Sequence, residues 1–215
     1  MTEEHPAEPD PGERAPDALL GLWRRTELAL ADPVGQFQIA SGAEHVLWFQ
    51  TPTRYADLRF GDEPSFEHGV FCGRQHWDWP EVRFHHEIDS SGVFENDEGT
   101  LEWLDANTLI ETGEFEREGR TQRYRERWER QSPSLSAGTP LRLEARERRL
   151  PSGKLWALRL QVGQHSVIVY TNSSGPNALF HERTDSGSLE HRVGPTKFLP
   201  EIRWWVEVDS CETGA

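Results

Sequence analysis

The stretch TQRYRERWERQ, residues 121–131, alternates as a β-strand with one buried face does. Side chains of a strand point alternately to opposite faces, so Tyr124, Glu126 and Trp128 share one face. The two aromatic residues make this the inner face, and Glu126 therefore lies inside the protein. A buried carboxylate needs a cationic partner or a raised pKa, and the expected partners are Arg59, Arg25 and His86.

Short alternating runs of this kind recur along the chain, separated by Gly, Pro, Asn, Asp and Ser, with almost no helical periodicity. A short helical turn is expected only at 65–73. Links of hairpin length favour antiparallel neighbours, and closure into a barrel would leave no unpaired edge. The sequence therefore predicts an all-β protein built of antiparallel barrels. The strands are expected at 21–30, 44–51, 54–60, 81–89, 108–116, 121–131, 141–150, 154–162, 165–171, 177–183 and 201–208.

Composition divides the chain and limits its partners. We expect a disordered tail at 1–17, a first barrel at 18–130, a linker at 131–139, a second, smaller barrel at 140–209 and a tail at 210–215. The formal charge of −14 argues against nucleic acid or an anionic membrane as partner. The acidic, proline-rich start does not resemble a signal peptide, so a cytoplasmic location is expected.

Strand phase selects further candidates for the interior. In RYADLRF, residues 54–60, one face holds Tyr55, Asp57 and Arg59, and either that face or the opposite, apolar one could be interior. In 81–89, His86 shares the apolar phase of Val82, Phe84 and Ile88. Arg25 is in phase with a tryptophan. One of Glu111 and Glu114 is expected inside, and the pattern of 108–116 does not decide which.

The sequence contains few motifs that are typical of metal binding or catalysis. His76, His85, His86 and Cys72 match no zinc pattern, and no metal or cofactor is expected. Glu126 and His86 could serve as general acid or base, although structural pairing is the simpler reading. Both Cys72 and Cys211 are expected to be free thiols. Whether the protein is an enzyme stays open.

The order of several short motifs over residues 20–130 resembles a family named for a yeast interactor of the Hrr casein kinase. The motifs are a Y-x-D-x-R strand, an H-x-I-D strand, D-E-G, E-x-G and a Y-x-E-x-W strand. They match Tyr55, Asp57, Arg59, His86, Ile88, Asp89, Asp97, Glu98, Gly99, Glu111, Gly113, Tyr124, Glu126 and Trp128. The resemblance implies two calycin-like (lipocalin-like) barrels in tandem, and it implies no reaction.

Three functions follow as hypotheses. The first is a lipocalin-like protein that binds a small, partly apolar ligand in the first barrel. The second is a cofactor-independent isomerase, cyclase or hydro-lyase that uses the same cavity. The third is a protein-interaction module with a plugged barrel. The expected ligand-binding residues are Arg25, Tyr55, Asp57, Arg59, His86, Glu114, Tyr124, Glu126 and Trp128.

Overall fold

The computed structural model describes residues 11–40, 45–60, 69–91, 97–117, 119–131, 141–173, 175–184 and 187–193. Two short 3-10 helices, η1 (Pro11–Glu13) and η2 (Asp17–Leu19), precede the strands. The first nine strands are β1 (Gly21–Ala31), β2 (Phe37–Ile39), β3 (His45–Gln50), β4 (Tyr55–Phe60), β5 (Gly69–Asp78), β6 (Glu81–Asp89), β7 (Asp97–Asp105), β8 (Thr108–Arg117) and β9 (Arg120–Arg130). The other five are β10 (Leu143–Arg149), β11 (Leu155–Val162), β12 (His165–Asn172), β13 (Gly175–Thr184) and β14 (Gly187–Val193). Within the described ranges, no helix is long and apolar enough to cross a membrane.

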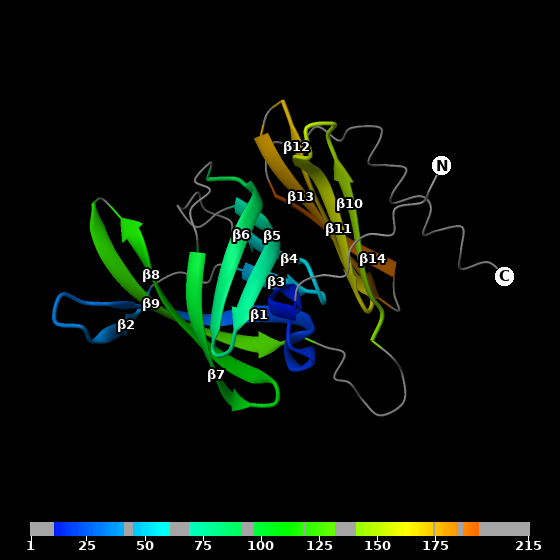
Figure 1. The fold of residues 1–215 in the computed structure, drawn as a ribbon. Helices are drawn as coiled ribbons and strands as arrows, with labels where there is room; N and C mark the ends of the chain where they lie inside the picture. Colours follow the sequence, from blue (N-terminus) through cyan, green and yellow to red (C-terminus); the bar gives the residue numbers. More distant parts are fainter. Residues whose placement is uncertain are drawn as a thin grey trace.

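The first part of the chain closes into an antiparallel barrel of eight strands (Figure 1). The sequential neighbours from β3 to β9 pair with one another, and β1 pairs with both β3 and β9 to complete the ring. The short strand β2 extends the end of β1 as a hairpin. Closure satisfies the backbone groups that an open edge would expose. The prediction of an all-β, antiparallel barrel is confirmed.

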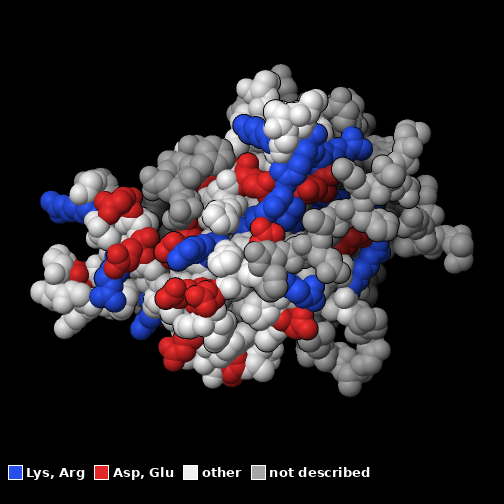
Figure 2. Space-filling view, in the orientation of Figure 1, with Lys and Arg blue, Asp and Glu red and all other residues white. Residues whose placement is uncertain are grey.

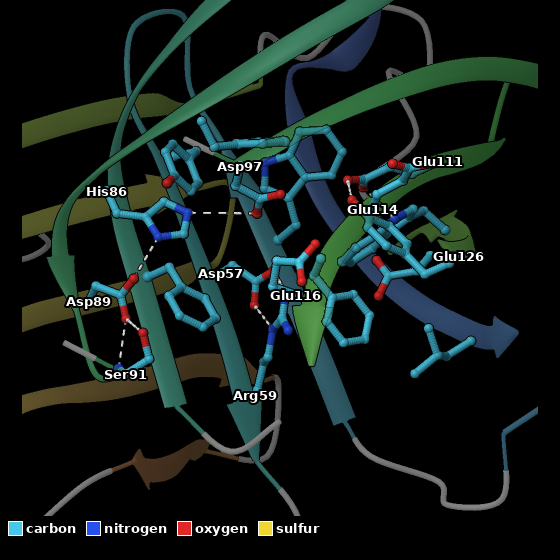
Figure 3. Close-up of a pocket in the computed structure, with 18 residues that line it drawn as sticks. Asp57, Arg59, His86, Asp89, Ser91, Asp97, Glu111, Glu114, Glu116 and Glu126 are labelled. Atoms are coloured by element: carbon cyan, nitrogen blue, oxygen red, sulfur yellow. Dashed lines mark hydrogen bonds and ion pairs between the residues drawn. The ribbon is translucent and has the colours of Figure 1, made fainter. Parts of the chain in front are cut away.

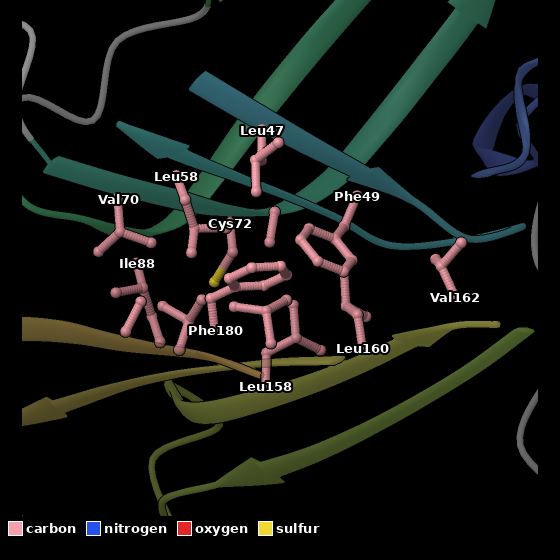
Figure 4. Close-up of a cluster of buried hydrophobic side chains, with 14 of the residues drawn as sticks. Leu47, Phe49, Leu58, Val70, Cys72, Ile88, Leu158, Leu160, Val162 and Phe180 are labelled. Carbon is pink, nitrogen blue, oxygen red and sulfur yellow. The ribbon is translucent and has the colours of Figure 1, made fainter. Parts of the chain in front are cut away.

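The second part of the chain forms an antiparallel sheet in the order β10-β11-β12-β13-β14, which lies against the outside of the barrel (Figure 1). A shared apolar cluster joins the two. Leu58, Val70 and Cys72 on the outer face of the barrel pack with Leu158 and Phe180 of the sheet (Figure 4). The apolar face of 54–60 therefore points out of the barrel, and its polar face points in.

A second barrel stays a prediction. Among the described strands, β14 pairs only with β13 and β10 only with β11, so the sheet is open as far as it is described. The strand expected at 201–208 lies outside the described residues, as do 132–139 of the linker and the tail at 210–215.

Two local predictions are wrong. Residues 11–17 were expected in a disordered tail, but they contain η1 and the start of η2, and Ala15 is buried, with its backbone N–H donating to the Pro52 carbonyl. Residues 69–73 were expected in a helical turn and belong to strand β5. Ala15 packs in the apolar cluster at one end of the barrel. Residues 69–73 pair with β4 and β6, and Val70 and Cys72 pack against the second sheet. None of these contacts is visible in the local sequence.

Charges of both signs mix on the outer surface. β10 holds two glutamates and three arginines, and Arg149 donates to Glu147 at 3.0 Å. Figure 2 shows basic and acidic side chains side by side on this face of the molecule. Ion pairs on the surface of this kind contribute little to stability.

Candidate functional site

The barrel interior is filled at one end and hollow at the other. Tryptophans, among them Trp23, Trp48 and Trp128, pack with Leu19 of η2 to fill one end. Beyond this cluster lies a cavity of about 330 Å³ (Figure 3). Rings of Trp48, Phe84 and Trp128 form an apolar wall, and charged side chains from β4, β6, β7, β8 and β9 form the rest.

One charge pair comes from β4. Asp57 and Arg59 lie on the inner face of the strand, and the Arg59 Nε donates to Asp57 Oδ1 at 3.1 Å. The guanidinium also lies 4.8 Å from the centroid of the Phe71 ring. Burial acts to lower the pKa of Arg59, but Asp57 and Glu126 outweigh it and raise that pKa, so the group stays cationic.

A second pair joins β1 to β9. The Arg25 guanidinium donates to Glu126 at 2.5 Å, and only 5% and 7% of the two side chains are exposed. Burial raises the pKa of Glu126, and Arg25 and Arg59 oppose this effect. Arg25 does not itself line the cavity; it holds Glu126, which does.

Glu111 is the second buried carboxylate, and it lies opposite Glu126 on the neighbouring strand β8. It accepts hydrogen bonds from the Tyr124 hydroxyl and the Trp128 indole, each at 3.0 Å. Burial raises the pKa of Glu111 well above its usual value, and Glu126 adds to the shift. The sequence left Glu111 and Glu114 open and placed Glu114 in the site; Glu114 is 59% exposed at the rim of the cavity.

The third charged group centres on His86 of β6. Its Nδ1 lies 2.7 Å from Asp89 Oδ2, and its Nε2 lies 3.7 Å from Asp97 Oδ2 (Figure 3). Asp89 also accepts from the Ser91 backbone N–H at 2.7 Å. Burial acts to lower the pKa of His86, but Asp89 and Asp97 outweigh it and raise that pKa to about 9. The imidazole is therefore cationic at neutral pH.

A β-bulge brings Asp89 into the site. The register between β5 and β6 shifts after Cys72, so that Cys72 faces Ile88 and Gly73 faces His86. Glu87 is the extra residue, and it reverses the alternation. Ile88 therefore packs outward against the second sheet. The prediction that Ile88 shares the inner face with His86 is wrong. Asp89 turns inward.

The expected site residues come together in one place. Tyr55, Asp57, Arg59, His86, Glu114, Tyr124, Glu126 and Trp128 all line the cavity. Strand phase overlooked Trp48, Phe71, Phe84, Asp89, Asp97 and Glu111 as lining residues. Asp89, Asp97 and Glu111 do stand at matched positions of the family motifs, which was the available signal.

The two candidate acid–base residues are both held in ion pairs. Glu126 is held by Arg25 and His86 by Asp89, so neither is a free base at neutral pH. Cys72 is buried on the outer face of the barrel, away from the cavity, and burial raises the pKa of its thiol. Within the described ranges, no group of three or more His, Cys, Asp or Glu side chains is placed to hold a metal ion.

Comparisons with known proteins agree with the fold. The family model for Protein HRI1 matches residues 36–177. The crystal structure of the uncharacterized protein YLR301w from Saccharomyces cerevisiae superposes with a TM-score of 0.61 at 17% identity, covering 82% of this chain and 89% of that one. No curated protein matches. At 17% identity the structural likeness concerns the fold alone. The family match runs from β2 through the rest of the barrel and the second sheet to the first residues of β13, and the chain belongs to the HRI1 family.

Proposed function

We propose that the barrel binds a small, partly apolar molecule. The observation that carries this proposal is the cavity of about 330 Å³ with an aromatic wall on one side and charged groups on the other. Its volume falls at the lower end of the range of roughly 300–1,000 Å³ found for small-molecule pockets. A bicyclic compound is of a suitable size.

The charges inside the barrel support binding because they are arranged along its wall. Arg25 with Glu126, Arg59 with Asp57 and His86 with Asp89 are neutralised in pairs within or between neighbouring strands. A packed interior would need side chains to cross the space between opposite walls. Here the apolar rings face that space, and covering them with a ligand removes apolar surface from water, which lowers the free energy.

Titration with the uncharged fluorescent probe N-phenyl-1-naphthylamine, with native mass spectrometry of the purified protein in parallel, tests the proposal. Leu28 of β1 lines the cavity, so Leu28→Trp should fill part of it and weaken probe binding at least about tenfold. Leu104→Trp is the matched control, since Leu104 is 51% exposed and does not line the cavity. Equal probe binding by both variants, with no co-purified molecule in the mass spectrum, would refute the proposal.

A further inference from the structure

Two polar groups in the cavity wall have no hydrogen-bond partner among the described residues. They are the hydroxyl of Tyr55 and the Nε2 atom of His86, and both atoms are buried; the Nε2 atom has the Asp97 carboxylate at 3.7 Å, an ion pair that is longer than a hydrogen bond. Tyr55 is 2% exposed and the His86 side chain 8%. The other polar hydrogens of the aromatic wall are used, because the Trp48 indole donates to Gln50 and the Trp128 indole to Glu111. A buried polar group without a partner costs free energy unless something else bonds to it.

The same two groups are neighbours. Tyr55 of β4 pairs with Gly73 of β5, and Gly73 pairs with His86 of β6, so all three lie on one rung of the sheet. The glycine has no side chain to separate the other two, and the ring centroids of Tyr55 and His86 lie 6.3 Å apart. One ligand atom between them could therefore meet both.

Both groups are donors. Asp89 holds the Nδ1 side of the His86 ring, and the cationic ring carries a proton on Nε2 as well. Burial raises the pKa of Tyr55, and Asp97 adds to the shift, so its hydroxyl keeps its proton. Two converging donors are suited to an oxygen acceptor.

The charges around the two donors decide whether a charged or an uncharged oxygen acceptor is favoured. Asp97 Oδ2 lies 3.7 Å from His86 Nε2, while Asp57 and Asp89 are already paired. The rim adds Glu114 and Glu116. A carboxylate ligand would meet these negative charges, whereas an uncharged oxygen would not.

Resting on the proposed binding function, we propose that Tyr55 and His86 form a two-donor site for an uncharged carbonyl oxygen of the ligand. The apolar body of the ligand then lies against Phe84, whose ring centroid is 5.0 Å from that of Tyr55. Phe71, 5.0 Å from the His86 ring, covers the other side. The ligand class is a neutral aromatic or alicyclic ketone or amide.

Three matched compounds test this site by displacement of the fluorescent probe. 2-Acetylnaphthalene carries the carbonyl, 2-ethylnaphthalene replaces it with a hydrocarbon group, and 2-naphthoate adds a charge. In the wild-type protein the ketone should bind about tenfold more tightly than the hydrocarbon and also more tightly than the carboxylate. This comparison needs no variant, so it holds whether or not a substitution folds.

Tyr55→Phe should weaken binding of the ketone about fivefold and leave the affinity for the hydrocarbon unchanged. Its urea midpoint should not fall, because the hydroxyl that is lost has no partner. Tyr170→Phe is the control, since Tyr170 is buried in β12 and does not line the cavity. Equal affinities for ketone and hydrocarbon, or a ketone affinity that Tyr55→Phe does not change, would overturn the oxygen site alone. If neither compound binds, the proposed function fails as well.

Discussion

The buried pair of Arg25 and Glu126 should respond asymmetrically to the loss of either partner. Glu126→Leu leaves a guanidinium in the barrel wall, and an arginine cannot shed its proton at any ordinary pH. Removing one member of a buried pair in this way costs about 3–5 kcal/mol. With both side chains less than a tenth exposed, water cannot compensate for the missing carboxylate.

Arg25→Met should cost less, because the remaining carboxylate can become neutral. The free-energy cost of protonating Glu126 at pH 7, starting from an ordinary pKa of 4.5, is at most about 3.4 kcal/mol. Arg59 also attracts the Glu126 carboxylate and favours its charged form, so the total cost of Arg25→Met should stay below this limit. A folded-state pKa that is raised adds stability as the pH falls, so at pH 5 the cost of Arg25→Met should drop below about 1 kcal/mol. The cost of Glu126→Leu should not change.

Urea unfolding at pH 7 and pH 5, followed by tryptophan fluorescence, measures these differences against the wild-type protein at the same pH. The double variant Arg25→Met/Glu126→Leu should recover most of the lost stability. Arg83→Met is a control, since Arg83 forms an exposed pair with Glu98 and should cost no more than about 1 kcal/mol at either pH. If the cost of Arg25→Met is the same at both pH values, the pair does not carry the charges inferred here.

Three further predictions concern the site and its support. Because the pKa of His86 is raised from 6.5 to about 9, its contribution to folding stability is complete below pH 6.5 and is lost as the pH rises through 9. The free energy of unfolding measured in urea should fall by about 3 kcal/mol across this window, and the fall should be absent in His86→Gln. An identical slope in that variant would contradict it. Gly73→Ala should destabilise the protein by more than about 2 kcal/mol, because a Cβ at Gly73 would lie 1.9 Å from the His85 carbonyl oxygen at the bulge; near-wild-type unfolding would exclude this close approach. Phe180→Ala should cost about 3–5 kcal/mol in chemical denaturation by opening a cavity between sheet and barrel, against almost nothing for the exposed Leu104→Ala. A cost below about 1 kcal/mol would mean that the two do not pack as described.

Much of the site follows from strand phase. The alternation around Tyr124, Glu126 and Trp128 is regular through β9, and all three line the cavity as the period of two requires. Arg25 was recognised as an interior partner for Glu126 in the same way, although its distance from Glu126 along the chain is 101 residues.

Strand phase fails where the alternation is interrupted or where two faces look alike. The bulge at Glu87 moves Ile88 out and Asp89 in, and no feature of EVRFHHEID marks that residue as the extra one. In β8 neither face is uniformly apolar, so the burial of Glu111 depends on two donors from β9, Tyr124 and Trp128.

The sequence by itself determined an all-β barrel with charge in its interior, because the alternation of apolar and polar residues is a local property of each strand. Only the tertiary structure decided which face of β4 is interior. Both faces of this strand are covered, so its apolar face need not be the one inside the barrel: Ala56 and Leu58 are buried by the second sheet, and Asp57 and Arg59 face the cavity. The register shift beside Gly73 and the approach of Tyr55 to His86 depend on contacts between strands, and these contacts turn the buried charges into a candidate binding site.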